Sequence, residues 1–263
     1  MNLKTRVAGL ALLFAATANL APAALIISST GSAEVIDFTG FTGAGFAQAP
    51  AAGQLDSDEW RIGGLSTGPG TFGGTHDAGD FARGTSTGGV TTGGIYSFEV
   101  SAGNPALGFQ ATGSDVTPGD ITLQINNGTG QATSGIVVSY DVWVFNDQGR
   151  ANSLNFAHSS DDLTYTNVGA LDFTSAEAAD AVPVWVQVSR STTITTALAA
   201  GDDFFLQWNT DDVSGAGSRD EFAIDNISVT LTASAVPEPS SWALLALMGG
   251  VIVYRRRKKT SAA

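Results

Sequence analysis

The sequence contains no cysteine, and between residues 24 and 235 it contains no lysine either. Without cysteine the chain has no disulfide framework, no thiol nucleophile and no zinc–thiolate site, so a hydrophobic core must stabilise it. In the same range five arginines face 24 acidic residues, which makes this part of the chain strongly negative. Because such a surface repels phosphate backbones, the composition excludes nucleic-acid-binding proteins. It favours a secreted domain that stays soluble among acidic polysaccharides or holds divalent cations.

The sequence has only two histidines, and neither is part of a recognisable catalytic constellation. His76 lies in a glycine-rich stretch without an evident nucleophile, and His158 shares the apolar phase of Leu154 and Phe156. A triad needs a nucleophile, a base and an orienting group in contact, and a retaining glycosidase needs two carboxylates about 5 Å apart. Chance carboxylate pairs are unavoidable in so acidic a chain. We therefore predict a non-catalytic protein, with a secreted polysaccharide hydrolase on a jelly-roll scaffold as the alternative.

Residues 24–235 also lack any sustained helical periodicity. They contain about a dozen short alternating runs rich in Val, Ile, Thr, Phe and Trp, such as IYSFEV, ITLQIN, VWVQVS and FFLQWN, separated by glycine-rich turns. This pattern predicts one all-β domain, an antiparallel jelly-roll-like β-sandwich. Asn127-Gly128 between two runs indicates a tight hairpin turn. Residues 66–94 are too glycine-rich for core strands throughout, and we expect a long loop laid over one sheet.

The strand phase in GIVVSYDVWVF and VWVQVS separates core positions from outward positions. The phase that we expect to face the core comprises Ile136, Val138, Tyr140, Val142 and Val144 in the first run and Val184, Val186 and Val188 in the second. Trp143 and Trp185 then lie on the outward phase. Aromatic side chains on the polar side of a sheet can stack against sugar rings, so these two are candidate ligand-binding residues. The alternative is that glycine-rich loops cover both of them.

Carboxylates gather in NTDDVSGAGSRDEFAIDNISV around a Ser-Gly turn. The candidate metal ligands are Asp211, Asp212, Asp220, Glu221 and Asp225. Carboxylates so close repel unless they are paired, protonated or bound to a metal such as calcium, which prefers oxygen ligands. Arg219 lies among them and offers a bidentate partner, so calcium and a structural Arg–carboxylate network remain two alternatives. The apolar phase changes after Ile224, which predicts a β-bulge at Asp225-Asn226 that turns a carboxylate inward.

The N-terminus predicts export. Lys4 and Arg6 precede an uncharged apolar stretch at 7–18, and Ala21-Pro22-Ala23 offers small residues at the positions that a signal peptidase reads. We predict a signal peptide at residues 1–23, with cleavage after Ala24 or Ala18 as alternatives.

The C-terminus combines a short apolar stretch with a basic end. Residues 242–254 are interrupted by Gly249 and Gly250, and as a helix they would measure roughly 20 Å against a bilayer core of about 30 Å. The basic residues that follow at 255–259 are Arg255, Arg256, Arg257, Lys258 and Lys259. For an exported domain this block lies on the cytoplasmic side, as the positive-inside rule requires. We therefore predict a short transmembrane helix that holds the protein at the inner membrane.

Val236-Pro237-Glu238-Pro239, the apolar helix and the arginine cluster together resemble the PEP-CTERM sorting signal of Gram-negative bacteria. That resemblance implies an exosortase as processing partner, cleavage near residues 236–239, and release from the inner membrane to the cell envelope or the extracellular space. It also implies a link with exopolysaccharide and biofilm. The segment 24–235 resembles, more loosely, a β-sandwich module of bacterial exported proteins, which brings no catalytic residues. We thus expect an exported surface or matrix protein with carbohydrate as a candidate ligand.

Overall fold

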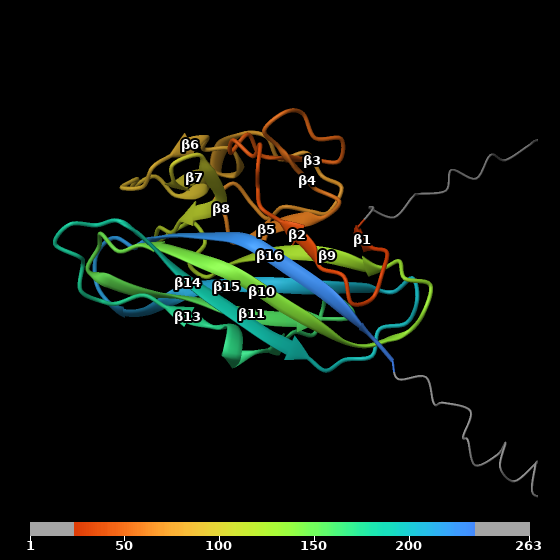
Figure 1. Ribbon diagram of the computed structural model, residues 1–263. Helices are drawn as coiled ribbons and strands as arrows, with labels where there is room; N and C mark the ends of the chain where they lie inside the picture. The colour runs from red at the N-terminus through yellow and green to blue at the C-terminus, as the bar shows by residue number, and fades with distance from the viewer. Residues whose placement is uncertain (1–23, 235–263) are drawn as a thin grey trace, which may run out of the picture.

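The computed structural model describes residues 24–234, which form two stacked β-sheets (Figure 1). The predicted signal peptide at residues 1–23 and the sorting tail at 236–263, with its apolar helix at 242–254, lie outside the described residues. Within residues 24–234 no helix is long and apolar enough to cross a membrane.

The first sheet is built on three long antiparallel strands, β9 (Gly119–Asn127), β15 (Asp203–Gly215) and β11 (Arg150–Ser159). Short strands extend both of its edges: β1 (Leu25–Ile27) and β5 (Trp60–Gly63) pair with β9, and β12 (Thr166–Asn167) and β13 (Phe173–Thr174) pair with β11. The pairing of β1 with β9 is parallel.

The second sheet runs in the order β14 (Trp185–Ile194), β10 (Thr133–Phe145), β16 (Glu221–Ala233), β8 (Asn104–Gln110), β7 (Gly94–Ser101) and β6 (Thr85–Ser86), with β2 (Glu34–Ile36) also on β16. The loops carry β3 (Phe46–Ala47), β4 (Leu55–Asp56) and the short 3-10 helices η1 (Gly79–Phe81) and η2 (Gly169–Leu171). From β8 to β11, and again from β14 to β16, consecutive long strands alternate between the sheets. The predicted antiparallel jelly-roll-like sandwich is confirmed.

The core lies between the sheets because each strand alternates apolar and polar side chains. The predicted inward phase of β10 is confirmed: Ile136, Val138, Tyr140, Val142 and Val144 are all buried. Trp208 of β15 is fully buried and makes edge-on contacts with the rings of Tyr140 and Phe156, each at 5.4 Å between centroids. The Tyr140 hydroxyl donates a hydrogen bond to the Leu171 carbonyl and so ties η2 to the core.

The sequence also predicted that Val184, just before β14, and Val186 in β14 face the core, and this prediction is wrong. Val184 and Val186 are 57% and 43% exposed instead of facing the core. β14 is the edge strand of its sheet, and Ile194 alone of its described residues belongs to the core cluster. Alternation therefore identified a phase correctly, but it did not show whether another layer covers that phase at the sheet edge.

The predicted hairpin at Asn127-Gly128 is also wrong, because β9 and β10 belong to different sheets. Asn127 is fully buried, and its side-chain amide donates to the carbonyls of Gln131, Leu198 and Ala199 at 2.8, 3.1 and 2.9 Å. The Asn127 side chain thus holds together a buried connection between the sheets. The positive φ falls instead at Gly130, at 73°.

Residues 66–94 form the predicted long loop region, with only η1, β6 and the first residue of β7 in regular structure. Buried Asp80 accepts hydrogen bonds from the Ser66 hydroxyl at 2.6 Å and the Thr67 amide at 3.0 Å, and it pairs with Arg83. In Figure 1 this orange-to-yellow part of the chain lies together on one side of the long strands. Its contacts reach both sheets, whereas the sequence predicted one: Phe72 packs on Phe205 of the first sheet, and Val90 bonds to β16 of the second.

Candidate functional site

The outer face of the first sheet carries a cavity of about 350 Å³. We call it the amide cavity, because side-chain amides from three strands line it. Its lining residues are Pro118, Gly119, Ser153, Asn155, Tyr165, Asn167, Gln207, Asn209, Thr210 and Asp211. Of the carboxylates predicted from sequence as site residues, only Asp211 belongs to this set.

Strand alternation and register together place the amides side by side. In β15 the inward phase holds Leu206 and Trp208, which turns Gln207 and Asn209 outward. Asn209 lies opposite Asn155 of β11 on one side and Asp120 of β9 on the other. The polar face therefore extends continuously across the three central strands.

Most of the amide groups in the cavity have no hydrogen-bond partner among the described residues. Within residues 24–234 the side-chain amides of Asn155, Asn167 and Asn209 make no hydrogen bond, and Gln207 donates one to the Thr122 hydroxyl at 3.2 Å. Asn155 and Asn209 are half-buried, and Asn167 is exposed. Each primary amide offers two donors and a carbonyl acceptor. The cavity can therefore bind a ligand that both donates and accepts hydrogen bonds at closely spaced positions.

One wall of the cavity is fixed by an ion pair between segments far apart in sequence. Both terminal nitrogens of Arg61 bond to the Asp162 carboxylate, at 2.5 and 2.7 Å, and the Tyr165 hydroxyl donates to the same carboxylate at 2.6 Å. The Arg61 guanidinium also lies 4.7 Å from the centroid of the Phe72 ring. Burial raises the pKa of Tyr165, and Asp162 raises it further, so the hydroxyl stays protonated.

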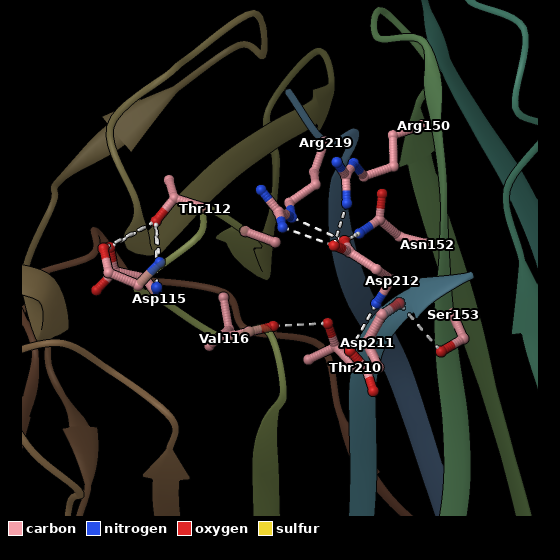
Figure 2. Close-up of polar contacts among 12 residues, drawn as sticks. Thr112, Asp115, Val116, Arg150, Asn152, Ser153, Thr210, Asp211, Asp212 and Arg219 are labelled. Atoms are coloured by element: carbon pink, nitrogen blue, oxygen red, sulfur yellow. Dashed lines mark hydrogen bonds and ion pairs between the residues drawn. The ribbon is translucent and has the colours of Figure 1, made fainter. Parts of the chain in front are cut away.

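The opposite end of the cavity is built on backbone contacts (Figure 2). The Thr210 hydroxyl donates to the Val116 carbonyl at 2.9 Å, and the Ser153 hydroxyl donates to the Asp211 carbonyl at 3.3 Å. Asp211 itself is exposed. Its carboxylate therefore adds negative charge at the rim of the cavity.

Next to this rim two arginines share one carboxylate (Figure 2). Arg219 bonds to Asp212 through two nitrogens at 2.8 and 2.6 Å, and Arg150 pairs with the same carboxylate. Burial works against ionisation of Asp212, but the two guanidinium groups outweigh it and lower the pKa of the carboxyl. This cluster ties β11 and β15 to the segment that leads into β16.

Asp220 and Glu221 are buried, and they accept hydrogen bonds from different loops. Asp220 accepts from the Gln148 amide at 3.1 Å, and Glu221 accepts from the Val90 amide at 2.6 Å. Burial, and then Asp147, raises the pKa of Glu221 to about 8, while burial raises that of Asp220 to about 6. One oxygen of each carboxylate has no hydrogen-bond partner in the part of the chain that the structure describes.

Asp225 lies at the predicted bulge, which is confirmed by a register shift between β10 and β16 and by a φ of 51° at Asn226. The carboxylate is fully buried and accepts from the Asn104 side chain at 2.9 Å and the Asn226 amide at 2.7 Å. Four of the five predicted metal ligands thus have separate partners, and the exposed Asp211 carboxylate accepts from the Asp212 amide at 2.8 Å. Among residues 24–234 no three His, Cys, Asp or Glu side chains are grouped so that they could hold a metal ion.

Trp143 and Trp185 lie on the outer side of the second sheet, where a second hydrophobic cluster covers much of them. The Trp185 ring is 5.0 Å from that of Phe98 and 5.4 Å from that of Phe145, and its indole N–H donates to the Thr87 carbonyl at 2.9 Å. Both indoles are only partly exposed, so they pack residues of the glycine-rich loop against the sheet.

Both histidine rings stack on phenylalanine rings. The His76 ring stacks on Phe81 at 4.7 Å and accepts a hydrogen bond from the Thr71 amide at 3.0 Å. The His158 ring stacks on Phe204 at 5.1 Å, and burial lowers its pKa.

Comparison with protein families finds a match at the C-terminus: residues 235–258 match the PEP-CTERM protein-sorting motif. The chain carries this motif, as its sequence predicts, and is an exported protein. A comparison with curated proteins finds no match.

Several solved structures are distantly similar in fold. A xylan-binding module, CBM15, has 13% identity and a TM-score of 0.39, with 78% of this chain and 99% of the module covered. An adhesin domain of Lys-gingipain from Porphyromonas gingivalis has 15% identity and a TM-score of 0.39, with 78% and 100% covered. The module TmCBM27, described for mannan recognition, has 13% identity and a TM-score of 0.35, with 53% and 83% covered. Likenesses this distant do not assign a ligand.

Proposed function

We propose that this exported protein is a non-catalytic carbohydrate-binding protein of the cell surface or extracellular matrix, and that the amide cavity is its binding site. The observation that carries the proposal is the set of amides from β11, β12 and β15 with no partner in the described chain. Sugars present vicinal hydroxyls, each a donor and an acceptor, which match the paired donor and acceptor of a primary amide.

The dimensions of the cavity support the same proposal. Its volume of about 350 Å³ lies within the usual range for small-ligand sites, which begins at roughly 300 Å³. Pro118 and the half-buried ring of Tyr165 add apolar surface beside the amides. A site that is open on one side of a sheet suits a segment of a polymer better than a free small molecule, because the rest of the chain can extend into solvent.

Asn209→Ala and Gln207→Ala are expected to weaken binding to the host's own exopolysaccharide by about tenfold each. Each change removes a hydrogen bond worth about 1–1.5 kcal/mol, and 1.4 kcal/mol corresponds to a factor of ten. Isothermal titration calorimetry with the full-length protein in mild detergent measures the effect. Gln187→Ala is the matched control, since it removes an exposed amide from β14 of the other sheet. Equal affinity in the wild type, Asn209→Ala, Gln207→Ala and Gln187→Ala would show that the cavity is not the binding site.

The alternative, a polysaccharide hydrolase, makes a different prediction for the same samples. A hydrolase would release reducing ends from the bound polysaccharide, and Asp211→Asn or Asp120→Asn would abolish this release. Such a result would contradict the non-catalytic proposal and support the hydrolase. We expect no release above the level of the buffer.

We infer further that a signal peptidase removes residues 1–23 and that an exosortase processes the tail at residues 236–239, which leaves residues 24–235 as the functional domain. Two prolines in Val236-Pro237-Glu238-Pro239 restrict φ and remove backbone donors, so the stretch favours an extended conformation that a protease can bind. The apolar segment 242–254 would hold the protein at the inner membrane until this step.

Intact-mass analysis of the protein from an exosortase-containing host is therefore expected to show loss of the tail beyond the motif. Replacing Pro237, Glu238 and Pro239 by alanine should retain the tail and leave the protein in the membrane fraction. Replacing Thr260 and Ser261, which lie beyond the basic block, is the control. A wild-type mature protein that still carries Arg255, Arg256 and Arg257 would contradict the proposal.

A further inference from the structure

The charges around the amide cavity restrict the class of ligand. We propose that the cavity binds an uncharged, hydroxyl-rich polysaccharide and rejects polymers of uronic acids and other anionic sugars; this inference rests on the proposed function. An anionic sugar gains most from charge-assisted hydrogen bonds with an arginine or a lysine at its binding site. Within residues 24–234 the arginines near this face are all bonded to carboxylates of the protein.

The arginine on this face is already committed to other groups. Both terminal nitrogens of Arg61 bond to Asp162, and its guanidinium lies over the Phe72 ring. A ligand carboxylate would have to displace Asp162, which also accepts the Tyr165 hydroxyl. The exchange would break three hydrogen bonds and remove a wall of the cavity.

The other arginines of residues 24–234 also have partners in the protein. Their partners are Asp80 for Arg83, Asp212 for both Arg150 and Arg219, and the Asp172 carbonyl for Arg190 on β14 of the second sheet. The range contains no lysine.

Carboxylates, by contrast, lie on several sides of the cavity. Asp211 lines it and is exposed, Asp120 lies opposite Asn209 in the register of β9 and β15, and Asp162 adjoins Tyr165. Arg61 balances one of these three charges, and the cluster of Arg150, Arg219 and Asp212 next to the rim adds one positive charge, so the local balance remains negative. An approaching polyanion is therefore repelled, whereas a neutral chain meets amides that can bond to its hydroxyls.

The test uses polymers that share a backbone but differ in charge. Hydroxyethyl cellulose is compared with carboxymethyl cellulose, and methyl-esterified polygalacturonate with its de-esterified form. The host's exopolysaccharide, separated by anion exchange into neutral and acidic fractions, is added so that the natural polymer is represented. Affinity electrophoresis of the full-length protein in mild detergent compares wild type, Asn209→Ala, Asp211→Asn and the control Gln187→Ala at low and high salt.

We expect binding to neutral polymers that is insensitive to salt, is lost in Asn209→Ala and is at least tenfold stronger than binding to the acidic partner. Asp211→Asn should reduce this preference, and high salt should do the same. Stronger binding to an acidic polymer that depends on Asn209 would overturn the inference but leave the proposed function intact. Absence of binding to every polymer, or binding that Asn209→Ala does not change, would instead refute the proposed function.

Discussion

Asp212→Ala is expected to lower the free energy of unfolding by about 2–4 kcal/mol. The change leaves Arg150 and Arg219 without the carboxylate that they share, so two neighbouring positive charges are no longer neutralised. Removing one partner of a fully buried ion pair costs about 3–5 kcal/mol. These side chains are still 13–25% exposed, so solvent screens part of the effect. Urea denaturation followed by circular dichroism measures the loss.

The neighbouring Asp211→Ala is the matched control, because Asp211 is exposed and has no arginine partner among the ion pairs of the described chain. Arg219→Ala should cost less than Asp212→Ala, since Arg150 still balances the carboxylate. Equal stability of Asp212→Ala and Asp211→Ala would refute a structural role for the cluster. A melting temperature that rises with calcium in the wild type but not in Asp212→Ala would indicate the metal site that we considered from sequence.

Stability is expected to fall as the pH rises from about 5 to 8, with Glu221 as the largest single contributor. Its pKa is raised from the ordinary value of 4.5 to about 8, first by burial and then by Asp147. The unfolded chain releases this proton near pH 4.5, whereas the folded protein keeps it to about pH 8, so the folded state binds more protons in between. The free energy of unfolding therefore decreases through this interval and levels off above it. Burial also raises the pKa of Asp220 to about 6 and that of Glu59 to about 7, and both groups add changes of the same sign.

Glu221→Gln should remove the largest single contribution to this fall and raise the free energy of unfolding at pH 8 by about 2–4 kcal/mol, because a pKa shift of one unit corresponds to about 1.4 kcal/mol. The glutamine carbonyl can still accept the hydrogen bond from Val90, and its amide can donate to Asp147. At pH 4.5 the variant and the wild type should differ by less than about 1 kcal/mol, since the wild-type carboxyl is then protonated in the fold.

Exposed Glu99→Gln is the control and should keep the wild-type pH profile. Denaturant titrations at intervals between pH 4.5 and 9 provide the measurement. A wild-type stability that is flat or rising between pH 5 and 8 would mean that Glu221 is ionised in the folded protein.

The sequence by itself determined the features that depend on neighbouring residues. Alternation in GIVVSYDVWVF identified the buried side of β10, and the change of apolar phase after Ile224 located the bulge at Asp225-Asn226. The glycine content of residues 66–94 indicated loop structure, and the C-terminal order of motif, apolar segment and basic block indicated the sorting motif. Each of these signals lies within one short segment, because strand periodicity, φ preference and a linear motif are local properties.

Only the tertiary structure decided which of these segments meet. Asn155 and Asn209 are outward in their own strands, a signal already present in NSLNFAH and FFLQWN, but only the pairing of β11 with β15 places them in one cavity. Strand order likewise left Val186 at an uncovered edge and sent β9 and β10 to different sheets. Carboxylates close together in sequence have partners that are distant in sequence: Asp212 pairs with Arg150, and Glu221 accepts a hydrogen bond from the Val90 amide. In a jelly roll consecutive strands cross between layers, so contacts at a site depend on an order of strands that no local pattern contains.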